Sequence, residues 1–210
     1  MEKPVQIIWS KWPGLKKLIS LNRILNVLIF TDFITMSAYG ILSPVLAIFL
    51  TDQVAGGSLL VVGIAEAIYF GTKSILQIPF GVLIDNTQGQ KIDFWFLFIG
   101  NLIMSCTLFF YLWAGAPWHI YLISAIYGIV DALAYPAWTG LFTRNMVADK
   151  ESFAWSYSTT IAEIGSAGAA LLGGVIAQFL GFRPLFAIVG SLSLFGTFLL
   201  FVFYDELKNT

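Results

Sequence analysis

The sequence predicts an all-α integral membrane protein whose six transmembrane helices form a bundle of two three-helix repeats. Hydrophobic residues make up 58% of the chain and charged residues only 11%, whereas a soluble domain carries about 25% charged residues. Six apolar runs are long enough to cross a bilayer, which takes about 20 residues per helix. Ionisable residues fall in runs one, two, four and five but not in runs three and six, so the pattern repeats after three helices.

We expect the six spans at about 24–50, 59–84, 94–114, 118–142, 153–180 and 184–204 within a membrane domain of residues 24–204. The first run is too long for the core of a signal peptide, so we expect it to remain in the protein. The basic and aromatic segment 1–23 is expected either to lie along the membrane surface or to form a floppy tail. A short tail, 205–210, follows the last span.

The basic residues of the loops predict the orientation. With the N-terminus inside, nine basic residues lie on the cytoplasmic side and one, Arg183, lies outside. Such a bias sets the topology of short-looped membrane proteins. We therefore expect a multi-pass protein of the cytoplasmic (plasma or inner) membrane, with both termini in the cytoplasm and the lipid bilayer as a partner.

Prolines and small residues predict how the helices bend and pack. Pro44, Pro79 and Pro136 interrupt spans one, two and four, and each removes a backbone hydrogen bond, so they are candidate hinges. Small residues recur at every fourth position of spans four and five, which lets helix backbones approach closely. The alternative is static packing without any bending motion.

The composition argues against an enzyme. His119 is the only histidine and Cys106 the only cysteine, so no metal cluster can be assembled from His and Cys ligands. A nucleophile needs a base within hydrogen-bond reach, and His119 is expected near the outer face. We expect no catalytic residue, no metal and no cofactor, and the net charge of −1 does not favour nucleic acid.

Asp32 in span one and Asp131 in span four are the candidates for chemistry in the cavity. An ionisable residue inside the bilayer is costly unless it faces the protein interior or a water-filled path. A carboxyl group in such a place can take up and release protons. The alternative is that Asp32 is held by hydrogen bonds from Thr31, Thr35 or Ser43 and serves only helix packing.

Aromatic residues at the same level, notably Tyr39, Tyr135 and Trp138, are candidates to line a pocket for an apolar or flat solute. Such side chains also commonly serve as packing residues or as anchors at the membrane interface.

The segment after span two resembles the loop signature of the major facilitator superfamily. It carries Gly81, Asp85, Gly89 and Lys91. Span one, with Phe30-Thr-Asp32-Phe33, Gly40 and Pro44, is similar to the first helix of the drug-exporter branch. The run Tyr135-Pro136-Ala137 followed by Arg144, Gly165, Gly173-Gly174 and Gly181-Phe182-Arg183 is similar to helices four and five. The resemblance implies a six-helix half of that fold, built as a 3+3 inverted repeat.

Several positions depart from the family pattern. Asn86 and Gln90 stand where the loop signature usually has arginine, which leaves Asp85 and Lys91 as the charges of the cytoplasmic latch. Ser124 replaces a basic residue of helix four, and Ala169-Ala170 replaces the Gly-Pro step of the antiporter signature. The family normally has twelve helices.

The resemblance implies secondary active transport of a small solute, with a possible link to protons. In the family, helices one and four line the cavity, two and five meet the opposite half, and three and six face outward. We therefore expect a homodimer, or pairing with another six-helix half, through spans two and five. Lys73 and Glu163 are expected to pair, either between copies or within one. The interface candidates are Glu66, Lys73, Glu163, Gly165, Ala169 and Gly173.

Two alternatives to a transporting dimer stay open. In the first, the chain is a non-transporting membrane partner or assembly subunit that keeps the half-fold. In the second, it is a truncated fragment of a twelve-helix transporter. The substrate, the coupling ion and the direction of transport are not readable from the sequence.

Overall fold

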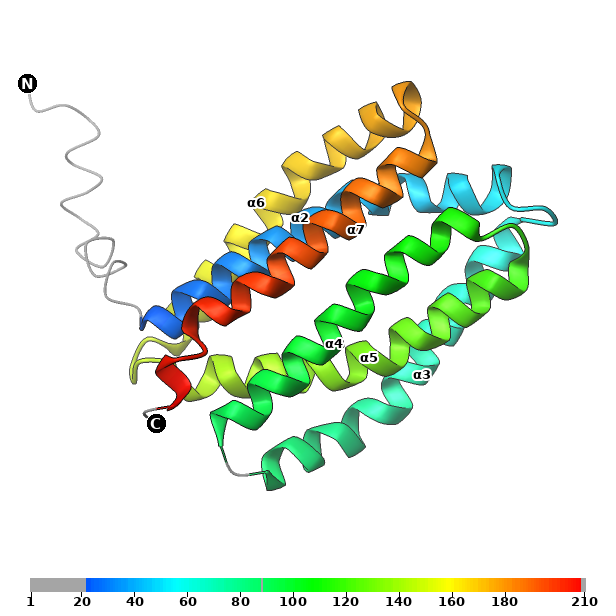
Figure 1. Ribbon diagram of the computed structural model, residues 1–210. Helices are drawn as coiled ribbons and strands as arrows, with labels where there is room; N and C mark the ends of the chain where they lie inside the picture. Colours follow the sequence, from blue (N-terminus) through cyan, green and yellow to red (C-terminus); the bar gives the residue numbers. More distant parts are fainter. Residues whose placement is uncertain (1–21, 88, 209–210) are drawn as a thin grey trace, which may run out of the picture.

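The computed structural model describes residues 22–87 and 89–208. Within them, six helices are long and apolar enough to cross a membrane (Figure 1). They are α2 (Arg23–Asp52), α3 (Leu59–Asn86), α4 (Gln90–Phe110), α5 (Pro117–Arg144), α6 (Glu151–Phe179) and α7 (Phe182–Leu199). The 3-10 turns η2 (Tyr111–Trp113) and η3 (Leu200–Phe203) prolong α4 and α7, and η4 (Glu206–Lys208) follows. The six predicted spans are confirmed, whereas the N-terminal segment up to residue 21 lies outside the described residues.

Side-chain caps and glycine turns set the helix boundaries. The backbone N–H of Ile24 donates to the Asn22 side chain, and that of Val61 donates to Ser58, each at 3.3 Å. These contacts satisfy backbone donors that a helix start leaves free. Gly89 and Gly181 precede α4 and α7 with φ of 133° and 86°, a conformation that favours glycine.

The contacts between helices carry the signature of an internal repeat. Helix α2 packs on α6 and α7, α5 packs on α3 and α4, and α4 packs on α7. Exchanging α2 with α5, α3 with α6 and α4 with α7 reproduces the same set of contacts. Because each repeat has an odd number of helices, the second one enters the membrane from the opposite side. The fold is therefore a 3+3 inverted-repeat bundle, as the sequence predicted.

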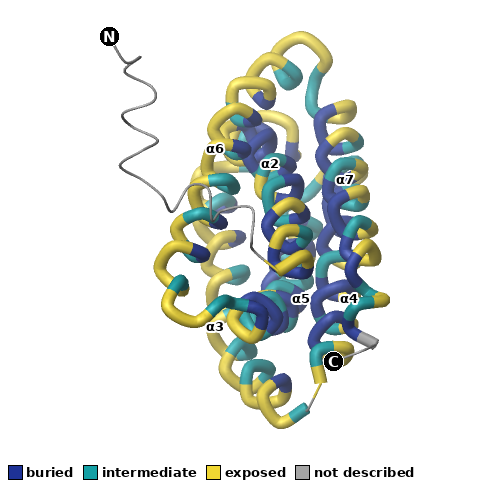
Figure 2. Tube along the Cα trace, turned by 90° about the vertical axis from the view of Figure 1, so that its left-hand side faces the viewer, coloured by how far each residue is buried: buried dark blue, intermediate teal, exposed yellow. Residues whose placement is uncertain are grey.

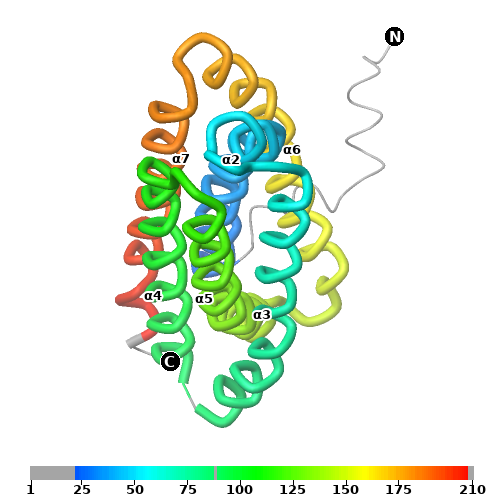
Figure 3. The backbone as a smooth tube through the Cα atoms, turned by 90° about the vertical axis from the view of Figure 1, so that its right-hand side faces the viewer, coloured from blue at the N-terminus to red at the C-terminus, as the bar shows by residue number. Residues whose placement is uncertain are grey.

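Burial separates the helices into a centre and an open side. Figure 2 shows α2 with much of its length buried, whereas α3 and α6 are mostly exposed. Within the apolar windows of α3 and α6, only 11% and 17% of residues are buried, against 44% in each of the other four helices. Figure 3 shows α3 and α6 on one side of the bundle and α4 and α7 on the other. The open side is therefore made by the second helix of each repeat.

Two of the helices extend beyond the predicted apolar spans and take in charged residues. Helix α4 begins at Gln90 and so includes Lys91 and Asp93, and α7 begins at Phe182 and so includes Arg183. Asp93 is fully buried. The predicted spans 94–114 and 184–204 still contain no charged residue, because the charges lie in polar first turns that precede the apolar runs.

The small residues of α6 pack inside the chain. Gly165, Ala169 and Gly173 are buried, and a Cβ atom added to Gly173 would lie 2.0 Å from the carbonyl oxygen of Ile41 on α2. These residues therefore bring α6 close to α2 and do not lie on the open side, where a second copy was expected. Pro44, Pro79 and Pro136 lie inside α2, α3 and α5.

Candidate functional site

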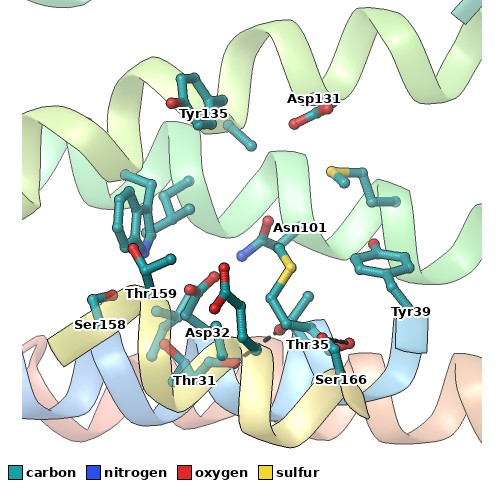
Figure 4. Close-up of a pocket in the computed structure, with 18 of the residues that line it drawn as sticks. Thr31, Asp32, Thr35, Tyr39, Asn101, Asp131, Tyr135, Ser158, Thr159 and Ser166 are labelled. Carbon is teal, nitrogen blue, oxygen red and sulfur yellow. Dashed lines mark hydrogen bonds between the residues drawn. The ribbon is translucent and has the colours of Figure 1, made fainter. Parts of the chain in front are cut away.

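A cavity of about 340 Å³ lies between α2, α4, α5 and α6. The five residues that the sequence singled out for a cavity all line it: Asp32, Tyr39, Asp131, Tyr135 and Trp138. Figure 4 shows Asp131 and Tyr135 on one side and Asp32, with Thr31 and Thr35, on the other. The first helix of each repeat thus supplies one carboxyl group, and the cavity lies between them.

Asp32 receives no hydrogen bond from the hydroxyls that were expected to hold it. The Thr31 hydroxyl donates to the carbonyl of Leu28 and the Thr35 hydroxyl to the carbonyl of Thr31, each at 2.9 Å. A hydroxyl has one proton to donate, so neither is free for the carboxyl group. Ser43 lies about three turns along the helix, roughly 16 Å away. None of the three hydroxyls is therefore available to hold Asp32 in a purely packing role.

Asp131 is held by a lysine and a tyrosine of α3. The Lys73 ammonium lies 2.6 Å from Asp131 Oδ2, and the Tyr69 hydroxyl donates to the same oxygen at 2.5 Å. Lys73 also donates to the Tyr69 hydroxyl at 3.4 Å and lies 5.1 Å from the centre of the Tyr135 ring. Lys73 and Glu163 do not pair within the described chain, because α3 packs on α5 while α6 packs on α2; a pair between two copies stays a prediction.

Glu163 contributes a third carboxyl group to the same cavity from α6. Of the three, only Asp131 has an ion pair within residues 22–87 and 89–208. Glu66, the remaining charged candidate of α3, is exposed. The Trp138 indole N–H is buried without a hydrogen-bond partner among the described residues.

Several polar groups of the cavity were not predicted from the sequence. Asn101, Ser158, Thr159 and Ser166 line it, and the Ser166 hydroxyl donates to the carbonyl of Met36 at 3.0 Å. Asn101 could have been found, since an amide in an otherwise apolar span is costly to bury without a partner. The hydroxyls of α6 carry no such signal because they can bond their own helix backbone.

A second polar cluster lies at the end of the bundle where α4 and α6 begin. Arg144, in the last turn of α5, pairs with the buried carboxylate of Asp93. The Asn145 amide donates to Gln90 at 2.8 Å and accepts from Asn22 at 3.0 Å. These contacts join the end of α5 to the starts of α2 and α4. This cluster was not predicted from the sequence, because its members come from helix ends far apart in the chain.

The loop signature lies at the same end. Gly81 and Asp85 belong to α3, Gly89 immediately precedes α4, and Lys91 is in its first turn. Asp85 and Lys91 are both exposed, and neither has an ion pair within the described parts of the chain. The structure thus places the two charges at the same end without joining them.

His119 has a structural role. The backbone N–H of Ala116 donates to its Nδ1 at 3.1 Å, which caps the start of α5. The side chain lies at the opposite end of α5 from Arg144.

Comparison with known proteins agrees with this architecture. The model of the Major Facilitator Superfamily matches residues 28–209. The multidrug resistance protein MdtG of Salmonella arizonae is 26% identical over 176 residues, which are 82% of this chain and 42% of that protein. MdtG of Salmonella newport matches with the same identity and coverage. The chain spans less than half the length of these curated relatives. On the match over nearly its whole length and on its six-helix inverted repeat, the chain belongs to the Major Facilitator Superfamily.

Proposed function

We propose that the chain forms half of a secondary transporter that carries a small, positively charged organic solute across the cytoplasmic membrane. The observation that carries the proposal is the cavity with three carboxyl groups, Asp32, Asp131 and Glu163, of which only Asp131 has a cation beside it among the described residues. Membership of a transporter family supports translocation. The name of the MdtG relatives, multidrug resistance proteins, supports an organic solute.

The charge of the cavity favours a cation over a neutral solute. Charged groups away from bulk water are stable only when paired or hydrogen-bonded, and Asp32 and Glu163 have no counter-charge within the described chain. Tyr39, Tyr135 and Trp138 add aromatic faces, which attract cations. A flat organic cation can pair with the carboxyl groups and stack on the aromatic rings of the cavity.

Asp32 is the proposed coupling residue. Its carboxyl group can either bind a proton or pair with the positive charge of the solute, because no basic side chain of the described chain pairs with it. Proton release then accompanies solute binding, and a proton gradient drives the exchange. Pro44 and Pro136, in the same helices as the two aspartates, are the proposed points of bending.

The decisive experiment is flux of a fluorescent organic cation, ethidium, into or out of proteoliposomes under an imposed pH gradient. Asp32→Asn should abolish gradient-driven flux, while Asp32→Glu should retain part of it because the titratable group remains. Asp52→Asn, at the exposed far end of α2, is the matched control. Equal flux in wild type and Asp32→Asn rules out the coupling role. A folded protein without flux favours the alternative of a non-transporting membrane partner.

We further propose that α3 and α6 contact a second six-helix half, with a second copy of this chain as the first candidate. Two observations support this: these helices bury the smallest share of their residues, and the chain covers 42% of the length of its relatives. Arg23, Lys91, Arg144 and Lys150 lie at one end of the bundle, which supports an orientation with that end in the cytoplasm.

A further inference from the structure

The three carboxyl groups of the cavity differ in how open they are to a solute. One oxygen of Asp131 accepts from both Lys73 and Tyr69, at 2.6 and 2.5 Å. Asp32 and Glu163 have no ion pair in residues 22–87 and 89–208. A carboxylate that is already paired with an ammonium group has little to gain from a second cation. Three carboxyl groups therefore line the cavity, but only Asp32 and Glu163 are open, that is, without a cation of the described chain beside them.

Lys73 pairs with Asp131 on the side of that residue away from the cavity. Asp131 lines the cavity and Lys73 does not. The ammonium lies over the ring of Tyr69 at 5.7 Å and over that of Tyr135 at 5.1 Å, and only 21% of the lysine side chain is exposed. Tyr135 is one helical turn from Asp131 on α5 and itself lines the cavity. The lysine is thus enclosed by its carboxylate, a hydroxyl and two aromatic faces.

We propose that Lys73 is a specificity-determining residue. By occupying Asp131 it leaves Asp32 and Glu163 as the open carboxyl groups of the described cavity, and so limits the positive charge of the solutes that bind there. The proposal rests on the proposed function in one respect, that the cavity binds organic cations. Without Lys73, Asp131 becomes a third open acid, and solutes with two positive charges gain more than solutes with one.

The first test measures whether Asp131 is open, and it requires no solute. Dicyclohexylcarbodiimide modifies protonated carboxyl groups in apolar surroundings, and mass spectrometry identifies the modified residues. In the wild-type protein we expect modification of Asp32 and Glu163 but not of Asp131. Lys73→Met should expose Asp131 to the reagent, whereas Lys73→Arg should protect it. Lys150→Met, which removes a lysine at the start of α6, is the matched control.

The second test measures selectivity by equilibrium dialysis of the purified protein with tetraphenylphosphonium, which carries one charge, and decamethonium, which carries two. Lys73→Met should tighten binding of decamethonium relative to tetraphenylphosphonium about tenfold, the effect of one added charge contact. The double variant Lys73→Met/Asp131→Asn should restore the wild-type ratio, because it removes the added acid along with the lysine. The double variant also guards against a fold weakened by an unpaired charge.

The outcomes separate this proposal from the proposed function. If both probes bind to the wild type and their ratio is unchanged in Lys73→Met, the role of Lys73 is overturned while cation binding stands. Modification of Asp131 at the same rate as Asp32 in the wild type also overturns it. If neither probe binds to the wild type, the proposed cation class fails, and with it the selectivity assigned to Lys73.

Discussion

Asp93 is the most deeply buried charge of the described chain, with no exposed surface. One carboxylate oxygen pairs with Arg144, and the other is buried without a hydrogen-bond partner among the described residues. The acid lies in the first turn of α4 and the arginine in the last turn of α5, so each charge also suits the dipole of its own helix. The pair therefore holds the ends of two helices together.

Arg144→Gln should lower the free energy of unfolding by about 3–5 kcal/mol, because it leaves a buried carboxylate without its cation. Denaturation by SDS in mixed micelles, followed by circular dichroism, measures the change. The double variant Asp93→Asn/Arg144→Gln should recover much of the loss. Lys91→Gln, an exposed substitution at the same end, should stay within about 0.5 kcal/mol of wild type. Equal stability of wild type and Arg144→Gln contradicts a structural role for the pair.

The close packing of α2 on α6 holds two sides of the cavity, because Asp32 and Glu163 come from these helices. The contact is tight at glycines of both helices. A Cβ atom added to Gly40 of α2 would lie 2.7 Å from the backbone of Ser166, and one added to Gly173 of α6 would meet the backbone of Ile41. Backbone atoms cannot move aside as a flexible side chain can, so any substitution must separate the helices.

Gly173→Ala should destabilise the protein by about 1–3 kcal/mol, the usual cost of overpacking a close contact. Its neighbour Gly174 offers the matched control, because a Cβ atom added there has no heavy atom within 4 Å. Gly174→Ala should leave stability unchanged or raise it by about 1 kcal/mol through the better helix propensity of alanine. The same SDS titration compares the two. Equal effects of both substitutions would show that the α2–α6 contact is not the cause.

In the described part of the chain the open side of the bundle is formed by α3 and α6, and the proposed second half packs there. Ile75 on α3 and Ile164 on α6 are exposed on these helices and lie at similar depth. Phe195 on α7 is also exposed at similar depth but on the other side of the bundle. Exposure of apolar residues alone is normal in a membrane, since lipid covers them. A measured contact between copies is therefore needed to tell a side that binds a second half from a side that faces lipid.

Disulfide crosslinking tests the homodimer. In a Cys106→Ser background, copies carrying Ile75→Cys should crosslink to differently tagged copies carrying Ile164→Cys when oxidised in the membrane. This follows from the proposed packing of α3 of one copy on α6 of the other. Copies carrying Phe195→Cys should not crosslink with either. Crosslinking through Phe195 alone contradicts the proposed interface, and no crosslinking at any pair favours a different six-helix half as the partner.

Much of the architecture could be predicted because it depends on local properties of the chain. The length of each apolar run is set by the thickness of the bilayer, so the predicted spans agree with the helices except at their polar ends, as at Asp93. Asp32 and Asp131 were recognised because a carboxyl group is rare within an apolar span. Asn101 and Glu163 were not assigned to the cavity, because lining a cavity depends on which helices surround it.

By itself, then, the sequence determined the number of spans in the described chain, the three-helix period and the carboxyl groups that cannot lie in lipid unaided. Only the tertiary structure decided which charged residues form ion pairs. Lys73 was expected to pair with Glu163, within one copy or between copies, and within this chain it pairs with Asp131, because α3 packs on α5 and α6 packs on α2. An ion pair forms only within a few ångströms, and that distance depends on the packing of helices far apart in the chain.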